Sequence, residues 1–286
     1  MLENKNLNVN TKDEYNNTAL IFSSAFGYNE IVELLIENGA NIELKNKLGG
    51  NALILASYKN NYDIVKSLIE SGADVNAKNN NGGTALTRAV YWDKLEVAKL
   101  LIDNGADVNA KNNDGRTALM LTSNLEIAKL LIDNGADTKN SLTYLTSVTK
   151  WEMVKLLIDN GADINARSSG MFGTPPLIIG VINYMGYSPL PYYEYSEILE
   201  KIKFLIDKGA DVNVKDNGGR SVLEKTIDIL NIQHWELVLE IVKLLVDNGA
   251  NINAKDKNGN TALTYAKRKG NKGKEIVKFL MSRGAK

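Results

Sequence analysis

The chain has 286 residues, and its 34 basic and 34 acidic side chains give a formal net charge of zero, so no electrostatic argument favours a nucleic-acid partner. It has no cysteine, which excludes disulfides and cysteine zinc sites. Because it has only one histidine, His234, few side chains remain that could bind a catalytic metal or act in nucleophilic catalysis. The most apolar short segment, residues 177–182, is far too short to cross a bilayer, and the N-terminal sequence MLENKNLNVN lacks the apolar core of a secretion signal. We therefore expect no membrane partner and a cytoplasmic location.

One sequence motif recurs along the chain and marks its repeating units. Residues 99–111 read KLLIDNGADVNAK, and Leu100 and Leu101 with the preceding Val97 form an apolar stripe at helical spacing. Gly105 follows, and a glycine at a helix end allows the left-handed backbone that stops a helix. Each copy therefore predicts the end of a helix, a tight turn and an extended segment. Related copies occupy residues 66–78, 155–167, 203–215 and 243–255.

The spacing of the copies gives the repeat length. Gly39, Gly72 and Gly105 are 33 residues apart, and the later steps are 30, 26, 48, 40 and 35 residues. A Thr-Ala-Leu opening precedes several copies, and its threonine is expected to cap a first helix because the hydroxyl accepts from an exposed backbone amide. These openings begin at Thr84, Thr117 and Thr261, and the later glycines are Gly135, Gly161, Gly209, Gly249 and Gly284.

The 33-residue step, the Thr-Ala-Leu openings and the Asn-Gly-Ala-Asp-Val-Asn-Ala endings resemble the ankyrin-repeat family over nearly the whole chain. The resemblance implies an all-α solenoid of about eight helix-turn-helix units with short hairpin loops. It also implies a non-catalytic scaffold that binds a protein partner on its concave face. The family usually reads Thr-Pro-Leu-His, whereas here Ala85 takes the proline place and Thr87 the histidine place. The family's histidine network between neighbouring units is therefore not expected in its usual form.

The repeats divide the chain from end to end. Residues 1–12 are predicted to be a partial repeat or an N-terminal cap, because residues 7–12 look like the tail of an earlier unit. Two readings stay open: the array begins with a half-repeat, or the chain is a piece of a larger multidomain protein, such as an enzyme, in which it is a regulatory or targeting arm. The expected repeats are residues 13–45, 46–78, 79–111, 112–139, 140–167, 168–215, 216–255 and, as a C-terminal cap, 256–286.

Repeats four to seven depart from the regular length. Repeat four has three residues fewer between Leu119 and Glu126 than the preceding repeat, so its first helix or turn should lose about one helical turn. Repeat five is predicted to keep helices at residues 141–148 and 152–159 and to lack the hairpin before it. Repeat six carries an insertion rich in tyrosine and proline, whose prolines prevent a continuous helix and predict a projecting loop. Repeat seven is seven residues longer, close to two helical turns shared between its helices.

No residue pattern in the sequence predicts catalysis. His234 stands beside Trp235 without a second histidine, and recurring aspartates such as Asp74 and Asp107 belong to the repeated scaffold. We expect no catalytic, cofactor or metal site. An enzyme within the array is the alternative, and it would require turnover that His234→Ala abolishes.

Lysines recur after the extended segments, and stacked units would align them into a basic row. Lys45, Lys78 and Lys111 are examples. Two readings are left open: a solvated edge that discourages strand pairing, or a surface for an acidic partner.

Aromatic side chains are the strongest candidates for partner contact. The family resemblance implies that the ends of first helices and the hairpin tips line the binding face, and aromatic residues fall at those places. Large amphipathic side chains are typical of binding hot spots, although the same residues could instead pack against the next unit. We expect a monomer that binds a protein. The predicted partner-binding residues are Phe26, Tyr58, Tyr91, Trp92, Arg116, Tyr187, Tyr192, Tyr193 and Tyr195, the last four from the insertion.

Overall fold

The computed structural model describes residues 8–144, 151–167, 195–216, 218–229 and 235–286. The chain divides into two compact units, one of residues 1–138 with 150–156 and the other of residues 139–149 with 157–286. Helices build both units. Among the described residues, the nearest approach to a strand is one isolated bridge between Lys215 and Ser221. The prediction of an all-α fold is therefore confirmed.

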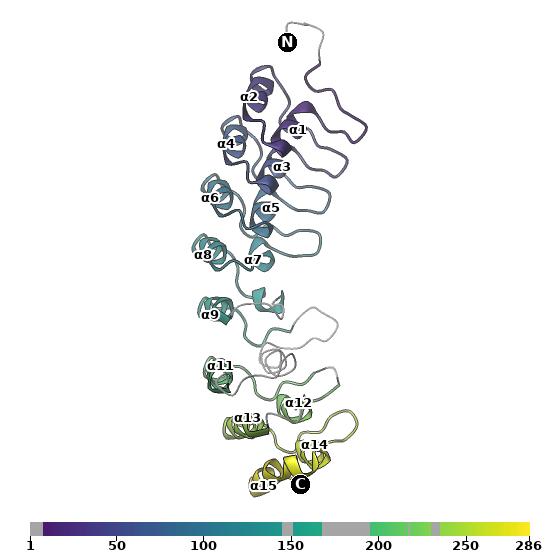
Figure 1. The fold of residues 1–286 in the computed structure, drawn as a ribbon, viewed down its shortest axis with the longest axis vertical. Helices are drawn as coiled ribbons and strands as arrows, with labels where there is room; N and C mark the ends of the chain where they lie inside the picture. The colour runs from purple at the N-terminus through teal and green to yellow at the C-terminus, as the bar shows by residue number, and fades with distance from the viewer. Residues whose placement is uncertain (1–7, 145–150, 168–194, 217, 230–234) are drawn as a thin grey trace. The chain divides into compact units, whose positions relative to one another are not determined.

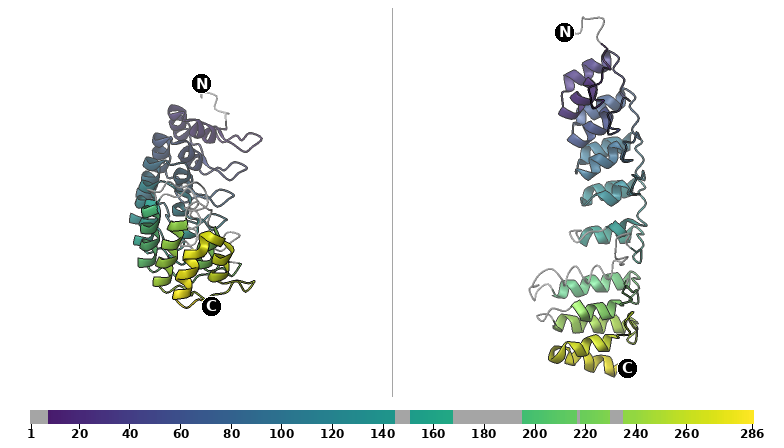
Figure 2. Two further views of the ribbon diagram at one scale, coloured as in Figure 1. Left: turned by 60° about the horizontal axis from the view of Figure 1, so that its bottom comes forward. Right: turned by 90° about the vertical axis from the view of Figure 1, so that its right-hand side faces the viewer.

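In the first unit, helix pairs stack through helices of the same kind. The first helices of the pairs contact one another in sequence, and the second helices do the same. The two rows of helices can be followed by their labels in Figure 1, and the loops between pairs leave this unit on one side (Figure 2). The first helices are α1 (Ala19–Phe26), α3 (Ala52–Lys59), α5 (Ala85–Tyr91) and α7 (Ala118–Leu121), and the second are α2 (Asn29–Glu37), α4 (Tyr62–Glu70), α6 (Leu95–Asp103) and α8 (Leu125–Asp133).

The repeated glycine ends each second helix of the first unit as predicted. Gly105 has a φ of 85°, in the left-handed region. Its amide donates to the Ile102 carbonyl at 2.9 Å, and the Ala106 amide donates to the Leu101 carbonyl at 3.0 Å. These bonds satisfy carbonyls that the last turn of α6 leaves without an intrahelical partner. The turn therefore closes the helix and directs the chain into the extended segment.

Thr84 caps α5, as predicted. Its Oγ1 accepts from the Thr87 amide at 3.3 Å, and the Thr87 Oγ1 accepts from the Thr84 amide at 2.8 Å. The two residues form a reciprocal capping box, which recurs at α14 with Thr261 and Thr264. Thr87 stands where the family resemblance places a histidine, and these hydrogen bonds stay inside its own repeat.

Thr117 does not cap α7, and the prediction is wrong at this position. The Thr117 hydroxyl is buried and has no hydrogen-bond partner among the described residues. The Met120 amide, which corresponds to the capped amide of α5, donates instead to the Thr117 carbonyl at 3.1 Å. Because α7 is only four residues long, this tight turn satisfies the amide without the hydroxyl.

Replacing each threonine by valine distinguishes the capping hydroxyl of Thr84 from the unpartnered hydroxyl of Thr117. Thr84→Val should lower the free energy of unfolding by about 1 to 2 kcal/mol, because it removes the acceptor for a helix-start amide. Thr117→Val should be neutral or stabilising, because it replaces a buried, unpartnered hydroxyl with a methyl group of similar shape. Urea unfolding followed by circular dichroism measures both variants. Equal losses would contradict the assignment of the two hydroxyls.

An asparagine in the extended segment joins neighbouring repeats. Asn76 Nδ2 donates to the Gly105 carbonyl at 3.0 Å, and Asn76 Oδ1 accepts from the Asp107 amide at 2.8 Å. Asn109 makes the same two bonds to the following repeat. Each side chain thus connects two backbone groups of the following repeat. The contact recurs in the second unit at Asn165, Asn213 and Asn253, and Asn10 supplies its acceptor half to the Asn41 amide.

The recurring lysines form a second set of links. Lys45 Nζ donates to the Lys78 carbonyl at 2.9 Å, and Lys78 Nζ donates to the Lys111 carbonyl at 3.2 Å. In the second unit, Lys215 Nζ donates to the Lys255 carbonyl at 3.0 Å. Lys45, Lys78 and Lys215 are therefore engaged with the backbone of the next repeat.

In the second unit, α12 contacts α13 and α14, and α13 contacts α11 and α15. The helix predicted at residues 141–148 differs in the structure, which has a 3-10 helix, η1 (Ser141–Tyr144), while residues 145–150 lie outside the described part. Lys139 stands where other repeats have the linking asparagine, and its carbonyl accepts from the Asp163 amide at 3.0 Å. Helix α9 (Trp151–Asp159) has residues in both units. The other elements of the second unit are α11 (Tyr195–Asp207), α12 (Val222–Ile229), α13 (Trp235–Asp247), α14 (Ala262–Arg268), η3 (Gly270–Gly273) and α15 (Lys274–Ser282).

Candidate partner-binding groove

Two adjoining pockets lie between the loops and the first helices of the first unit. One, of about 420 Å³, is lined by the loops at residues 79–83 and 112–116 with α5 and α7. The other, of about 370 Å³, is lined by the loops at residues 46–50 and 79–81 with α3 and α5. Asn81 and Arg88 line both pockets, which therefore form one continuous surface, called the aromatic groove below. Its lining includes Leu48, Tyr58, Asn79, Asn81, Arg88, Tyr91, Trp92, Asp114, Arg116 and Leu121.

The loops that wall the groove are held by asparagine side chains. Asn79 Oδ1 accepts from the amides of Asn81 and Gly83 at 3.0 and 2.9 Å. Gly82 has a φ of 73°, and a Cβ there would lie 2.8 Å from the Asn113 nitrogen of the next loop. The Asn113 amide donates to the Asn81 carbonyl at 3.0 Å. The glycine thus permits the close approach that joins the two loops, and the walls of the groove are fixed before any partner arrives.

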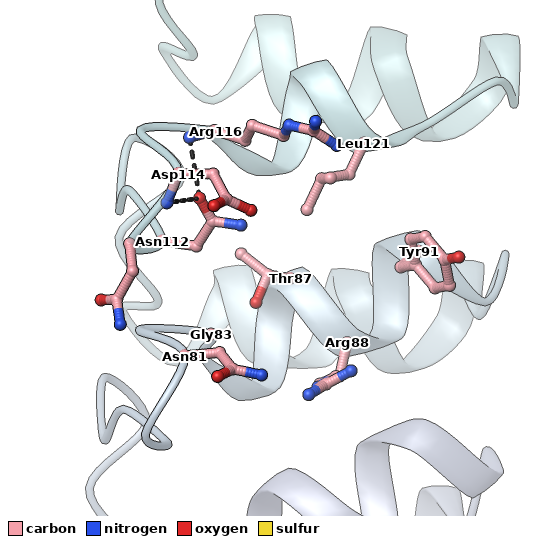
Figure 3. A pocket seen from close by; sticks show the side chains of 10 residues that line it. Asn81, Gly83, Thr87, Arg88, Tyr91, Asn112, Asp114, Arg116 and Leu121 are labelled. Carbon is pink, nitrogen blue, oxygen red and sulfur yellow. Dashed lines mark hydrogen bonds between the residues drawn. The ribbon is translucent and has the colours of Figure 1, made fainter.

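Figure 3 shows how the larger pocket is assembled from a loop and two helices. Asn112 Oδ1 accepts from the amides of Asp114 and Arg116 at 3.0 and 2.9 Å, which fixes the loop that carries both charged side chains. Arg88 and Tyr91 enter from α5, across the pocket from this loop (Figure 3).

Three aromatic rings form part of the apolar lining of the groove, together with Leu48, Leu55 and Leu121. Trp92 lies edge to face against Tyr58, with ring centroids 5.0 Å apart, and against Tyr91, at 5.4 Å. Trp92 is still 44% exposed and Tyr91 57% exposed. Edge-to-face packing restrains these rings, while their exposed faces remain available to another molecule.

The structure brings four predicted residues to the groove, namely Tyr58, Tyr91, Trp92 and Arg116. Phe26 is not among the residues that line it. Its ring is 63% exposed and stacks on Phe22 and Tyr28, with centroids 5.9 and 6.2 Å apart. This separate aromatic cluster on the first helix pair was represented in the sequence-based prediction by Phe26 alone.

The predicted residues of the insertion fall in a different part of the chain. Tyr187, Tyr192 and Tyr193 lie outside the described residues, as does His234. Tyr195 begins α11, but its side chain is also outside the described part. These four tyrosines therefore stay predictions.

Sequence reasoning missed Arg88 and the loop asparagines as groove residues. Arg88 precedes Tyr91 by three positions and Trp92 by four, a spacing that places all three on one face of α5. This helical spacing from the aromatic pair is the signal that could have identified Arg88.

Corresponding positions in the second unit hold a network of ion pairs. Asp216 Oδ2 lies 3.1 Å from Arg220 Nε and 3.2 Å from Lys225 Nζ. Arg220 also pairs with Asp228 at 3.2 Å. Burial raises the pKa of Asp216, but the Arg220 amide and the Lys225 ammonium outweigh it and leave that pKa below its usual value. The cations here are neutralised within the fold.

Asp256, a second carboxylate of this unit, is expected to stabilise the fold to an extent that depends on pH. The Asn260 side chain, at 3.0 Å, and the Tyr265 hydroxyl, at 2.7 Å, hydrogen-bond to Asp256 Oδ2 and lower the pKa of Asp256 from 3.8 to about 2. Burial, followed by the hydrogen bond to Asp256, raises the pKa of Tyr265 to about 12. Because the folded-state pKa of Asp256 is depressed, its contribution is present above pH 4 and is lost as the pH falls toward 2.

Asp256→Asn is therefore expected to unfold more easily than the wild type at pH 5, with the difference shrinking between pH 4 and pH 2. Urea unfolding at a series of pH values measures this difference in the free energy of unfolding. A difference that stays constant across the acid range would show that the ionised carboxylate contributes nothing.

Within the described part of the chain, no group of three or more histidine, cysteine, aspartate or glutamate side chains is arranged to hold a metal ion. No helix in that part is both long and apolar enough to cross a bilayer.

Comparison with known proteins agrees with the repeat architecture. A family model described as "Ankyrin repeats (3 copies)" matches residues 1–79, 43–112 and 199–286, and one described as "Ankyrin repeat" matches residues 114–144. The curated proteins gave no match. The matched ranges cover well over half of the chain and include the groove residues Tyr58, Arg88 and Arg116. The chain belongs to the ankyrin-repeat family.

Proposed function

We propose that this protein is a non-catalytic interaction scaffold that binds a segment of a protein partner in the aromatic groove. Ankyrin repeats are generally protein–protein interaction modules. The observation that carries the proposal for this surface is the cluster of Tyr58, Tyr91 and Trp92, whose rings line two adjoining pockets while Tyr91 and Trp92 remain about half exposed.

The groove suits binding because its parts are already ordered. The loops are hydrogen-bonded to one another, and the aromatic rings restrain each other, so a partner would immobilise few additional groups. Tyrosine and tryptophan offer large contact areas with few rotatable bonds. Asn81, which lines both pockets, adds a side-chain amide that can donate to and accept from an extended peptide backbone.

A phage-displayed library of random dodecapeptides, panned on the intact immobilised chain, tests this proposal. Selected peptides should lose at least about tenfold in affinity for Tyr58→Ala, since truncation of an interface hot spot costs roughly 2 kcal/mol or more. Tyr62→Ala is the matched control, because Tyr62 is 41% exposed on α4 and lies outside the groove lining. If the selected peptides bind Tyr58→Ala and Tyr62→Ala as tightly as the wild type, the groove is not the binding site.

A further inference from the structure

Arg88 is the cation at the centre of the aromatic groove. It lines both pockets and is half-buried. No carboxylate among the described residues forms an ion pair with it, although Asp114 lines the same pocket. Arginine keeps its charge at any pH the fold survives, so this guanidinium sits partly desolvated without a balancing charge.

The second unit shows how this fold neutralises a cation at the same repeat position. Lys225 lies four residues after the helix-start residue Ser221, as Arg88 lies four after Thr84. Lys225 Nζ is 3.2 Å from Asp216, which lies five residues before Ser221. The residue five before Thr84 is Asn79, whose amide carries no charge.

Asn79 and Asp216 make the same loop hydrogen bonds. Asp216 Oδ1 accepts from the amides two and four residues later, at 2.8 and 2.9 Å. Asn79 Oδ1 accepts from the amides two and four residues later, at 3.0 and 2.9 Å. Either residue therefore supports the loop, and the asparagine leaves Arg88 without the carboxylate that Lys225 has.

From this difference we infer that the groove selects an acidic segment of its protein partner, with a partner carboxylate bound by the Arg88 guanidinium. The inference rests on the proposed function and adds that the bound segment of the partner is acidic. The charged side chains that line the groove are Arg88, Arg116 and Asp114, so the groove presents more positive than negative charge. The neighbouring Tyr58 and Trp92 rings reduce water access and strengthen a pair formed there.

The lysine row does not provide the same feature. Lys45 Nζ and Lys78 Nζ already donate to backbone carbonyls of the next repeat, whereas the Arg88 guanidinium has five N–H donors and no ion pair in the described chain. The specific anion site is therefore placed at Arg88, and the lysine row contributes only a general positive field.

The test uses fluorescein-labelled dodecapeptides selected on the intact wild-type chain. Selection should enrich aspartate and glutamate, and copies with these residues changed to asparagine and glutamine should bind at least about tenfold more weakly. Arg88→Gln should lose the same factor for the acidic peptides and little for their amide copies. Lys99→Gln, an equal charge change at an exposed position on α6 outside the groove lining, should bind like the wild type.

A second variant tests the inference with every groove cation in place. Asn79→Asp preserves the loop hydrogen bonds and supplies a carboxylate where Asp216 stands in the second unit. It should weaken the binding of acidic peptides by a factor similar to that of Arg88→Gln, because the new carboxylate forms an ion pair with the Arg88 guanidinium. Unchanged binding by Asn79→Asp together with unchanged binding by Arg88→Gln would overturn the inference.

The outcomes separate this inference from the proposed function. Peptides without acidic residues that still depend on Tyr58 would overturn the acidic preference and leave the groove as a protein-binding site. Binding insensitive to both Tyr58→Ala and Arg88→Gln would overturn both proposals. A fluorescein-labelled single-stranded oligothymidylate tests a nucleic acid as the occupant. If it binds more tightly than the peptides, and Arg88→Gln abolishes this binding, the groove binds a nucleic acid and the acidic-peptide inference is overturned.

Discussion

Leu101→Ala is expected to lower the free energy of unfolding by about 2 to 5 kcal/mol, the range for truncating a fully buried leucine. Leu101 is 0% exposed on α6, which packs on α5 of its own pair and on α4 and α8 of the neighbouring pairs. A cavity at this position therefore weakens the core that the neighbouring repeats share, and nearest-neighbour contacts of this kind carry much of the stability of a repeat array.

Leu100→Ala is the matched control for this prediction. Leu100 is the preceding residue of the same helix and is only partly buried. It loses less apolar contact on truncation, so its cost should be less than half that of Leu101→Ala. Urea unfolding followed by circular dichroism measures both. Similar costs for the two variants would contradict a core concentrated at the Leu101 face of α6.

Tyr91→Ala combined with Trp92→Ala is expected to weaken groove-selected peptides by about 30-fold or more, while leaving the fold intact. A loss of roughly 2 kcal/mol is typical of an aromatic hot spot and corresponds to about this factor. Both rings are about half exposed, and they end α5 rather than filling its buried face, so their removal costs little stability.

Fluorescence anisotropy with a labelled, selected peptide measures the affinity, and thermal unfolding followed by circular dichroism checks the fold. Tyr15→Ala supplies a control for loss of an exposed aromatic ring, since Tyr15 is 59% exposed and outside the groove lining. Unchanged peptide affinity in the folded double variant would remove both aromatic residues from the binding surface.

Much of the fold follows from local chemistry that the sequence displays. The apolar stripe through Val97 and Leu101 predicts α6, and Gly105 predicts its end, because each depends on neighbouring residues alone. Thr84 predicts a cap for the same reason. Thr117 has the same local sequence, but it opens a shortened helix in which the Met120 amide finds the Thr117 carbonyl.

The groove was only partly predictable. Tyr58, Tyr91 and Trp92 are recognisable because they are large and fall at the ends of first helices. The role of Arg88 depends on Asn79 in place of an aspartate and on a pocket shared by two repeats, and neither feature is visible without the arrangement of the loops. Phe26 shares the local pattern of the groove aromatics, yet its ring stacks within its own helix pair.

Hydrogen–deuterium exchange of the intact chain, with and without a groove-selected peptide, shows whether the aromatic groove receives the partner. Bound peptide should slow exchange in the loops at residues 46–50, 79–83 and 112–116 and at the ends of α3 and α5, with little change in α4, α6 and α8. Protection confined to the second helices of the first unit, or to residues 195–286, would contradict the claim that this groove receives the partner.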